Sequence, residues 1–272
     1  MGVAMRVAAV VVLGLWAWAG GLAQETSAVF QGEAAERFLR EASIRRIEDL
    51  GVGVTNPKRI TLRRDDVERR AVFKSIDLEK PGTSRMADGS LAVAFQDTWQ
   101  TEIAAYEVDK IIGLGMVPAT VERSVRGVRG SLQWWVEAMM AEAQRRKEGL
   151  SPPDIDAWNK RVYKMRLFDV LICNVDRHLN NILVTADFDL RLIDHSRSFR
   201  PFNTLDHPES LTMFSRALLA GIERLEFEDL KKRVGRNVRD GQIRALLARR
   251  DAILALVRAR VATEGEAAVL YD

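Results

Sequence analysis

The sequence predicts an α+β fold in which a smaller, strand-rich lobe precedes a larger, helical lobe. Three observations lead to this prediction. Strand-like alternation is concentrated in the first half of the 272 residues, helical periodicity dominates the second half, and one short hairpin lies among the later helices. Strands and helices that are segregated along the chain in this way are typical of α+β proteins.

The first lobe opens with a polar, alanine-rich segment at 24–41, which we expect to form a helix or an arm. Alternating apolar residues then predict two strands around a turn. An apolar stripe at helical spacing predicts a helix that ends before Pro118, and a cluster of Pro, Gly, Ser and Asp predicts a loop. In chain order the elements are strands at 59–62 and 69–76, a loop at 81–90, a helix at 98–115, and strands at 117–123 and 131–136.

The second lobe is predicted to be helical apart from one hairpin, whose strands are short apolar runs joined by a polar turn. We therefore divide the chain into an N-terminal extension with the first lobe, residues 24–137, and the second lobe, residues 138–272. The predicted elements of the second lobe are helices at 137–146 and 157–173, strands at 182–184 and 190–193, and a helical tail at 211–271.

Composition excludes several classes of protein. Hydrophobic residues make up 47% of the chain and charged residues 29%, which excludes intrinsic disorder. The single cysteine, Cys173, excludes an intrachain disulfide scaffold and a multi-cysteine zinc site, and its apolar surroundings predict that it is buried. With 41 basic and 38 acidic residues, the net charge of +3 is too small to indicate nucleic-acid binding, so we expect no nucleic-acid partner.

Residues 1–23 are typical of a secretory signal peptide. Arg6 precedes an apolar run from Val7 to Trp18, and the small residues Gly21 and Ala23 fit the −3 and −1 positions of a cleavage site. The alternative is a retained membrane anchor, but this run is well short of the roughly 20 residues that span a bilayer. We therefore expect an exported protein, periplasmic or extracellular, whose mature chain does not span the membrane.

Three polar residues surround the predicted hairpin of the second lobe. Asp176 follows a predicted helix, Asn181 comes five residues later, just before the first strand, and Asp194 ends the second strand. The oxygens of Asn181 and Asp194 can therefore converge beside Asp176. Hard cations such as Mg²⁺ take a few oxygen ligands from a protein and the rest from water and phosphate. Phosphoryl transfer needs such a set, with a carboxylate for the incoming hydroxyl.

This region resembles a known family of kinases. Asp176-Arg177-His178-x-x-Asn181 matches the D-R-H-x-x-N catalytic loop of phosphatidylinositol 3/4-kinases and their protein-kinase relatives. Ile193-Asp194-His195 occupies the place of their I-D-F-G motif. Secretory-pathway kinases of the Golgi casein kinase type and HipA-type bacterial kinases have similar variants. The resemblance covers about residues 51–199 and implies a two-lobed, protein-kinase-like fold.

The resemblance also implies roles for individual residues. Asp176 would orient or deprotonate an acceptor hydroxyl, and His178 would stabilise the transferred phosphoryl group or serve as the base. Asn181 and Asp194 would hold Mg²⁺ or Mn²⁺. Lys74 would bind the phosphates of ATP.

Further residues would complete the nucleotide site. Glu102 would position Lys74, although Glu107 is a competing partner. The backbone around Gly51 and Gly53 would approach the phosphates. Trp135 and Glu137 fall where the adenine-binding strand and the interlobe hinge are expected.

These residues lead to a primary hypothesis and to alternatives. The first is an exported kinase that uses ATP with Mg²⁺ or Mn²⁺ and phosphorylates a hydroxyl of a protein Ser/Thr, a sugar or an inositol lipid. The second is an inactive pseudokinase that binds a nucleotide or a partner, because Asp194-His195-Ser196 replaces D-F-G. The third is transfer of AMP by the same fold. A metal-dependent nuclease or phosphatase is disfavoured, because too few carboxylates converge and Lys74 and Glu102 would have no role.

Overall fold

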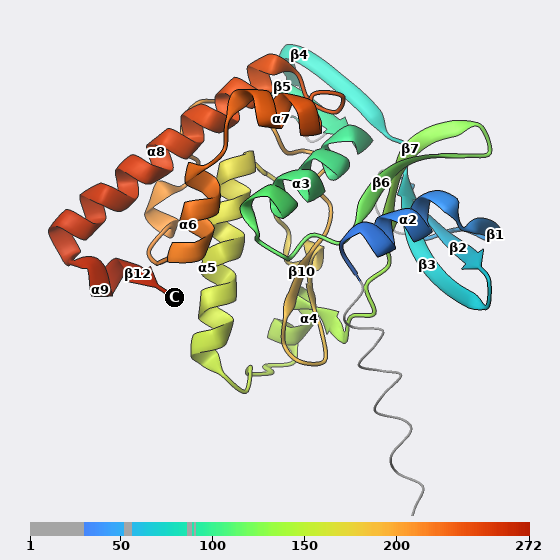
Figure 1. The fold of residues 1–272 in the computed structure, drawn as a ribbon, viewed down its shortest axis with the longest axis horizontal. Coiled ribbons are helices and arrows are strands. Elements are labelled where there is room, and N and C mark those ends of the chain that lie inside the picture. The colour runs from blue at the N-terminus through green and yellow to red at the C-terminus, as the bar shows by residue number, and fades with distance from the viewer. Residues whose placement is uncertain (1–29, 52–55, 86–88, 90) are drawn as a thin grey trace, which may run out of the picture.

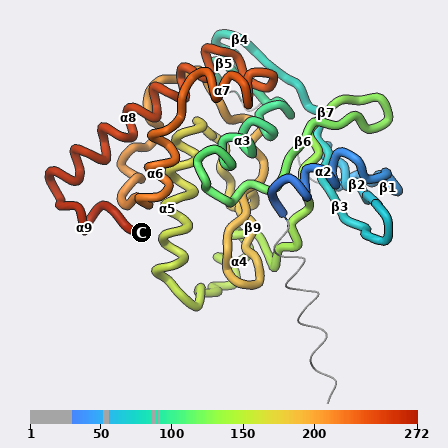
Figure 2. The backbone as a smooth tube through the Cα atoms, in the orientation of Figure 1, coloured from blue at the N-terminus to red at the C-terminus, as the bar shows by residue number. Residues whose placement is uncertain are grey.

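The computed structural model describes residues 30–51, 56–85, 89 and 91–272. The predicted signal peptide at 1–23 and the predicted phosphate-loop residue Gly53 lie outside these residues. A sheet-based lobe and a helical lobe lie side by side, with helix α3 between them (Figure 1). The tube in Figure 2 shows that the chain enters the sheet lobe first and ends in the helical lobe.

The small lobe is built on a five-stranded antiparallel sheet in the order β1-β2-β3-β7-β6. In β2, Ile60 and Leu62 are buried while Arg63 is exposed, because alternate side chains point to opposite faces of a strand. Helix α2 (Glu33–Glu41) contacts β2, β6 and β7. The strands are β1 (Ser43–Asp49), β2 (Lys58–Arg64), β3 (Val67–Lys74), β6 (Thr120–Val125) and β7 (Val128–Trp134).

A second hairpin stands where the sequence predicted a loop. Strand β4 (Asp77–Arg85) pairs antiparallel with β5 (Leu91–Thr98), so the loop expected over 81–90 is wrong for residues 81–85. The register is irregular between Lys80 and Thr83, where Pro81 and Gly82 are accommodated. Proline is tolerated at such a bulge because it interrupts the ladder only locally. Turn-forming residues therefore marked a bulge and not the end of the strand.

Helix α3 (Trp99–Ile112) confirms the helix predicted over 98–115 and joins the two lobes. It contacts β6 and β7 of the small lobe and α6 and α7 of the large lobe, so nearly all of its faces are buried. It ends at Gly113, whose φ of 71° lies in the left-handed region that favours glycine. At Gly221 of α6, a Cβ atom would collide with the carbonyl of Ile112, so α6 packs directly on the end of α3.

The large lobe is helical around one small sheet. The predicted hairpin is confirmed: β9 (Ile182–Val184) pairs with β10 (Leu190–Leu192), and β8 (Met140–Ala141) adds a third strand. The tail is interrupted by two short parallel strands, β11 (Phe214–Ser215) and β12 (Leu270–Tyr271), so it is not helical throughout. The helices are α4 (Glu142–Lys147), α5 (Ile155–Ile172), α6 (Arg216–Glu223), α7 (Phe227–Val234), α8 (Asp240–Glu264) and α9 (Glu266–Val269).

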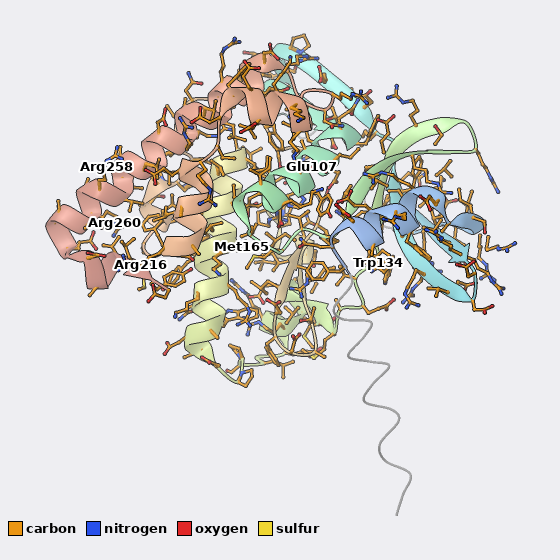
Figure 3. The ribbon with its side chains drawn as sticks, viewed as in Figure 1. Glu107, Trp134, Met165, Arg216, Arg258 and Arg260 are labelled. Carbon is orange, nitrogen blue, oxygen red and sulfur yellow. The ribbon has the colours of Figure 1, made fainter. Side chains whose placement is uncertain are left out.

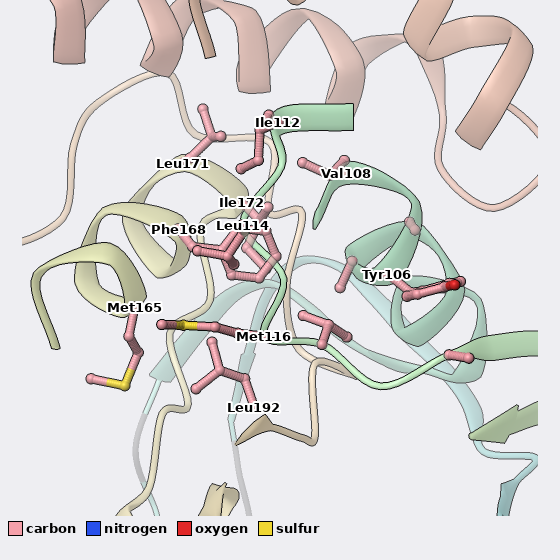
Figure 4. Close-up of a cluster of buried hydrophobic side chains, with 14 of the residues drawn as sticks. Tyr106, Val108, Ile112, Leu114, Met116, Met165, Phe168, Leu171, Ile172 and Leu192 are labelled. Atoms are coloured by element: carbon pink, nitrogen blue, oxygen red, sulfur yellow. The ribbon is translucent and has the colours of Figure 1, made fainter. Parts of the chain in front are cut away.

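One hydrophobic core runs through both lobes. Its centre contains side chains of α3, of the segment that follows α3, of α5 and of β10 (Figure 4). The labelled residues there are Tyr106, Val108, Ile112, Leu114, Met116, Met165, Phe168, Leu171, Ile172 and Leu192. Within the described part of the chain, no helix has both the length and the apolar character needed to cross a membrane.

Candidate functional site

The centre of the site is a lysine held between two carboxylates. Lys74 ends β3, Glu102 lies in the first turn of α3, and Asp194 follows β10. The Lys74 Nζ atom is 2.6 Å from Glu102 Oε1 and 2.7 Å from Asp194 Oδ1. The side chain of Glu102 is only 2% exposed, whereas that of Asp194 is 40% exposed. The partner of Lys74 is thus Glu102, and the competing candidate Glu107 instead pairs with Lys110 and Arg233.

Burial and charge act in opposite directions on this group. Burial alone would lower the pKa of Lys74, but the negative charges of Glu102 and Asp194 outweigh it and raise that pKa above the ordinary 10.5. Burial alone would raise the pKa of Glu102, but Lys74 and a hydrogen bond from His195 hold it far below 4.5. Both side chains are therefore charged at neutral pH. A charged lysine beside a part-exposed carboxylate suits the binding of phosphate and a cation.

A glycine on the neighbouring strand allows Lys74 to take this position. Strands β3 and β7 pair here, with Lys74 opposite Ser131. A Cβ atom on Gly130 would collide with the carbonyl oxygen of Lys74 and with the ring of Phe73. The absence of a side chain at Gly130 is therefore required for the end of β3 to lie where it does.

The catalytic-loop motif follows directly from the end of α5. Cys173, which is buried as predicted, ends the helix with a φ of 51°, and burial raises the pKa of its thiol. Asn174 then donates a hydrogen bond from Nδ2 to Asp169 Oδ1 at 2.9 Å. This turn directs the loop away from the helix axis. The next residues, 175–181, pass beside the hairpin that carries Asp194.

Arg177 holds this loop together. Its guanidinium donates to both oxygens of Asp169 at 2.8 and 2.9 Å, and to the carbonyls of Asn181 at 3.1 Å and Ile193 at 2.7 Å. Its Nη2 atom also lies 2.9 Å from His195 Nε2. The rigid fork of donors on arginine suits such a role. Arg177 is therefore a structural residue within the motif and connects the loop to both strands of the hairpin at its open end.

Asp176 and His178 contact each other. Asp176 Oδ1 is 2.6 Å from His178 Nε2, and His178 is largely exposed, with 71% of its side chain accessible. Asp176 Oδ2 is 3.0 Å from Arg197 Nη1. Asp176 is thus a partly buried carboxylate with a cationic side chain at one oxygen and an imidazole at the other. A carboxylate in this environment can accept a further hydrogen bond from a hydroxyl, since each oxygen has two lone pairs.

The two predicted metal ligands lie at the same end of the hairpin. The N–H of Ile193, the residue before Asp194, donates to the carbonyl of Asn181 at 3.1 Å. Among the described residues, the side-chain amide of Asn181 has no hydrogen-bond partner, so its oxygen is free to bind a ligand. Asp194 has a φ of 61°, an uncommon value for a residue other than glycine and one often associated with function.

These donors fit a hard divalent cation that shares its coordination with phosphate. No group of three or more His, Cys, Asp and Glu side chains in the described part of the chain could hold a metal by itself. One carboxylate, one amide oxygen and several oxygens from water and phosphate match the preference of Mg²⁺. Such a cation, when bound, would neutralise phosphate charge, and Asn181 and Asp194 are the residues that would hold it.

The residues that replace F-G after Asp194 keep the site intact. His195 is fully buried and packs edge-on against Phe168. Its backbone N–H donates to Glu102 Oε2 at 3.0 Å. Burial, and then the nearby Arg177, lower the pKa of the His195 imidazole, so the ring is neutral at pH 7. Asp194 is thus held in place from the side of α3, although the sequence departs from I-D-F-G.

The structure places the remaining predicted residues at the edges of the site. Gly51 follows β1 with a φ of 64°, and the N–H of Leu50 donates to the carbonyl of Pro57 across the β1–β2 turn. Trp135 and Glu137 lie in the connection from the sheet to β8. Both contact Arg70: its guanidinium carbon is 4.9 Å from the centre of the Trp135 ring, and Nη2 is 2.6 Å from Glu137 Oε1. Nucleotide binding by these residues stays a prediction.

A separate pocket lies on the large lobe. It has a volume of about 290 Å³. Its lining includes Trp158 and Met165 of α5, Asn174 and Leu179 of the segment that follows α5, and His207. Its lining includes none of Lys74, Glu102, Asp176 and Asp194. The candidate site is therefore defined by the cluster of charges and not by this pocket.

Three residues of the site had no assigned role in the sequence. Arg197 and its second partner, Asp97, come from segments 100 residues apart, and no local pattern links them. Gly130 comes just before the strand predicted at 131–136, and no sequence pattern indicated its contact with Lys74. The available signal for Arg197 was its position three residues after Asp194, close to the active centre of any kinase-like chain.

Comparison with known structures supports the fold. The chain is similar to the crystal structure of a Golgi casein kinase, with a TM-score of 0.59 and 14% identity over 87% of this chain and 76% of that chain. A weaker match is the Helicobacter pylori proinflammatory kinase CtkA, with a TM-score of 0.49 and 11% identity over 80% of this chain and 93% of that chain. No protein-family model and no curated protein matches the sequence.

The first of these similarities confirms the predicted α+β, two-lobed, kinase-like fold class. At 14% identity it defines the fold alone, so the activity has to be argued from the site. The predicted relations to phosphatidylinositol 3/4-kinases and HipA-type kinases stay predictions.

Proposed function

We propose that this protein is an ATP-dependent kinase that transfers the γ-phosphate to a hydroxyl acceptor with the help of Mg²⁺ or Mn²⁺. The observation that carries the proposal is the position of Lys74, with Nζ 2.6 Å from Glu102 and 2.7 Å from Asp194. A buried ion pair is costly to form. We infer that it is kept here because it holds a lysine where it can bind phosphate, next to a residue that can bind a metal ion.

Different residues of the site contact the two substrates, ATP and the acceptor. Glu102 stays with Lys74 because it is buried, whereas the more exposed Asp194 can exchange Lys74 for a cation when ATP enters. Lys74 then contacts phosphate oxygens. Asp176 accepts a hydrogen bond from the acceptor hydroxyl and orients it towards the γ-phosphorus. This division places both substrates between the sheet lobe and the catalytic loop.

The reaction that follows is a single displacement. The acceptor oxygen forms a bond to the γ-phosphorus, and the bond from that phosphorus to the β,γ-bridging oxygen breaks. ADP leaves with the electron pair, and Asp176 receives the acceptor proton. His178, 2.6 Å from Asp176 Oδ1, is placed to stabilise charge at the same point.

The first test is thermal unfolding of residues 24–272 with and without ATP plus Mg²⁺ or Mn²⁺. A ligand at 100 times its dissociation constant stabilises the native state by about 2.7 kcal/mol, which corresponds to several degrees for a chain of this size. We expect this shift in the wild type and its loss in Asp194→Ala. The control Asp156→Ala removes an exposed carboxylate of α5 and should keep the shift. A wild type without any metal-dependent shift would contradict the proposal.

The second test separates catalysis from binding. Asp176→Asn should keep the ATP-dependent shift and lose turnover of γ-labelled ATP. Undiminished turnover in this variant would exclude Asp176 as the residue that orients the acceptor. If the wild type binds ATP but never turns it over, the protein is a pseudokinase, the alternative that the His195-Ser196 replacement suggested. Label transferred from the α-phosphate, with the larger mass of an adenylyl group on the product, would indicate AMP transfer.

We propose further that the kinase acts outside the cytoplasm, as residues 1–23 predict. The acceptor would then be an exported protein, a sugar or a lipid. Cell fractionation followed by sequencing of the mature N-terminus tests this. We expect the protein in the exported fraction with Gln24 as its first residue, and a cytoplasmic protein that retains residues 1–23 would contradict it.

A further inference from the structure

Arg197 bridges two carboxylates that come from different lobes. Its Nε atom donates to Asp97 Oδ2 at 3.1 Å, and its Nη1 atom is 3.0 Å from Asp176 Oδ2. Asp97 lies near the end of β5, and Asp176 lies in the catalytic loop. The guanidinium also lies over the ring of Phe95, with its central carbon 5.4 Å from the ring centre. Arg197 therefore has three contacts that fix its direction.

Asp97 is the fixed end of this bridge. Its side chain is 5% exposed, and its Oδ1 atom has no hydrogen-bond partner among the described residues. A buried carboxylate without a counter-charge is strongly unfavourable, so Arg197 is needed to compensate Asp97. This dependence holds the guanidinium at Asp97 and so determines where its other donors lie.

The backbone reinforces the bridge. The segment that follows Asp194 runs along β5: the N–H of Thr98 donates to the carbonyl of Ser196 at 2.9 Å, and the side chain of Gln96 donates to the carbonyl of Ser198. Arg200 donates to the carbonyl of Val93. Arg197 thus extends from a segment that β5 supports on both sides of it.

The two contacts of Asp176 differ in rigidity. His178 is 71% exposed and free to change rotamer, whereas Arg197 is anchored and 32% exposed. When an acceptor hydroxyl approaches Asp176, His178 can therefore shift and share Oδ1 with the hydroxyl, while Arg197 stays at Oδ2. A carboxylate held by one planar, charge-assisted hydrogen bond keeps its plane and its free oxygen in a defined direction.

We propose that Arg197 is a positioning residue, which holds Asp176 in the orientation needed to receive the acceptor hydroxyl and is itself held by Asp97. This inference rests on the proposed kinase function. By this inference, the contact between β5 and the segment after Asp194 supports catalysis, because it holds Arg197 in place. The opposite reading, in which Arg197 blocks Asp176, predicts a faster enzyme when Arg197 is removed.

The test compares variants of the purified protein in turnover of γ-labelled ATP and in the ATP-dependent thermal shift. Arg197→Ala should lower kcat roughly 100-fold, the order of loss expected from a misplaced catalytic group, with the KM for ATP and the thermal shift unchanged. Arg197→Lys keeps the charge but lacks the planar fork, so its kcat should fall between those of Arg197→Ala and the wild type. Arg258, which lies exposed on α8 (Figure 3), provides the matched control Arg258→Ala with wild-type kcat.

A double variant separates positioning from folding. Arg197→Ala leaves Asp97 as an uncompensated buried charge and should lower the unfolding temperature. Asp97→Asn combined with Arg197→Ala removes that charge, so the unfolding temperature should recover while kcat stays low. Millimolar guanidinium chloride, which supplies the missing group, should partly and saturably restore kcat of Arg197→Ala, in which Asp97 is present to bind it.

Each other outcome overturns the assignment. An unchanged or raised kcat in Arg197→Ala would show that Arg197 does not position Asp176. So would a kcat that recovers together with stability in the double variant, or a kcat of Arg197→Ala that guanidinium does not restore. A wild type that neither binds nor turns over ATP would overturn the proposed kinase function, and the role of Arg197 with it. If the wild type turns over ATP normally but the variants give one of the contradicting results above, only the role of Arg197 is overturned and the kinase function stands.

Discussion

Glu102 and His195 lie 93 positions apart in the sequence, and the backbone N–H of His195 donates to Glu102 Oε2 at 3.0 Å. The other oxygen of Glu102 contacts Lys74. One buried carboxylate on α3 therefore fixes both the lysine proposed to bind phosphate and the backbone next to Asp194, the proposed metal ligand. The position of α3 consequently determines whether both are in place.

Removing a charge of the Lys74–Glu102 pair should destabilise the protein. Lys74→Met should lower the free energy of unfolding by about 3–5 kcal/mol, because Glu102 becomes an uncompensated buried charge, whereas Glu102→Gln should cost less, because Lys74 keeps Asp194 at 2.7 Å. In urea denaturation the double variant should lose less than the sum of the two. Glu122→Gln removes a surface partner of Arg129 and serves as a control with an expected loss below about 1 kcal/mol. Additive losses at Lys74 and Glu102 would contradict a coupled pair.

Gly130→Ala should displace the end of β3. The added methyl group collides with the backbone of Lys74 and the ring of Phe73, so we expect a loss of roughly 1–3 kcal/mol and a reduced ATP-dependent thermal shift. The matched control is Gly241→Ala in α8, where a Cβ atom meets no other atom within 4 Å. It should stabilise the helix by roughly 0.5–1 kcal/mol. Equal effects of the two substitutions on the ATP-dependent shift would argue against a special role of Gly130.

Arg177→Lys should loosen the catalytic loop. Lysine keeps the charge but cannot reach both oxygens of Asp169 and the carbonyls of Asn181 and Ile193 together, so we expect a loss of roughly 3 kcal/mol. Amide hydrogen exchange should become faster in residues 175–182. Arg161→Lys, at an arginine that pairs with Asp189 of the same hairpin, should leave this exchange unchanged. Slow exchange in both variants would show that Arg177 does not hold the loop.

Asp109 should make stability depend on pH in a mildly acidic range. Burial raises its pKa to about 6 from an ordinary 3.8, although the backbone N–H groups of Val117, Met116 and Gly115 oppose this. Between these two values the folded state holds a proton that the unfolded state has released, so the contribution of Asp109 to stability falls as the pH rises. The shift corresponds to about 3 kcal/mol at most.

The measurement for Asp109 is urea denaturation of the wild type and of Asp109→Asn, which does not titrate. The difference in unfolding free energy, wild type minus variant, should decrease as the pH rises from about 4 to about 6. A difference that is flat or increases for Asp109→Asn would contradict the raised pKa.

The parts of the molecule that the sequence predicts correctly are those with local signals. Helical spacing identifies α3 and α5, and short apolar runs identify the β9–β10 hairpin. The contact of Lys74 with Glu102 was expected from the resemblance to kinases and not from a local pattern. The sequence did not predict the β4 strand, because Pro81 and Gly82 are typical turn residues. They are tolerated because β4 pairs with β5, and this pairing is a tertiary contact without a local sequence signal. The contact between Arg197 and Asp97 was not predicted either, because Asp97 reaches Arg197 only from strand β5.

The pairing of β5 with the segment after Asp194 also limits how the two lobes can move. Besides the chain connection at 135–139 and the packing of α3, contacts between the lobes include two hydrogen bonds at β5. The N–H of Thr98 donates to the carbonyl of Ser196, and Gln242 of α8 donates to Gln96 at 2.9 Å. A rotation about the 135–139 connection alone would break these contacts. We therefore expect the protein to adjust to a ligand by small sliding displacements between packed elements, the shear type of motion, and to keep the same overall dimensions in solution with and without ATP.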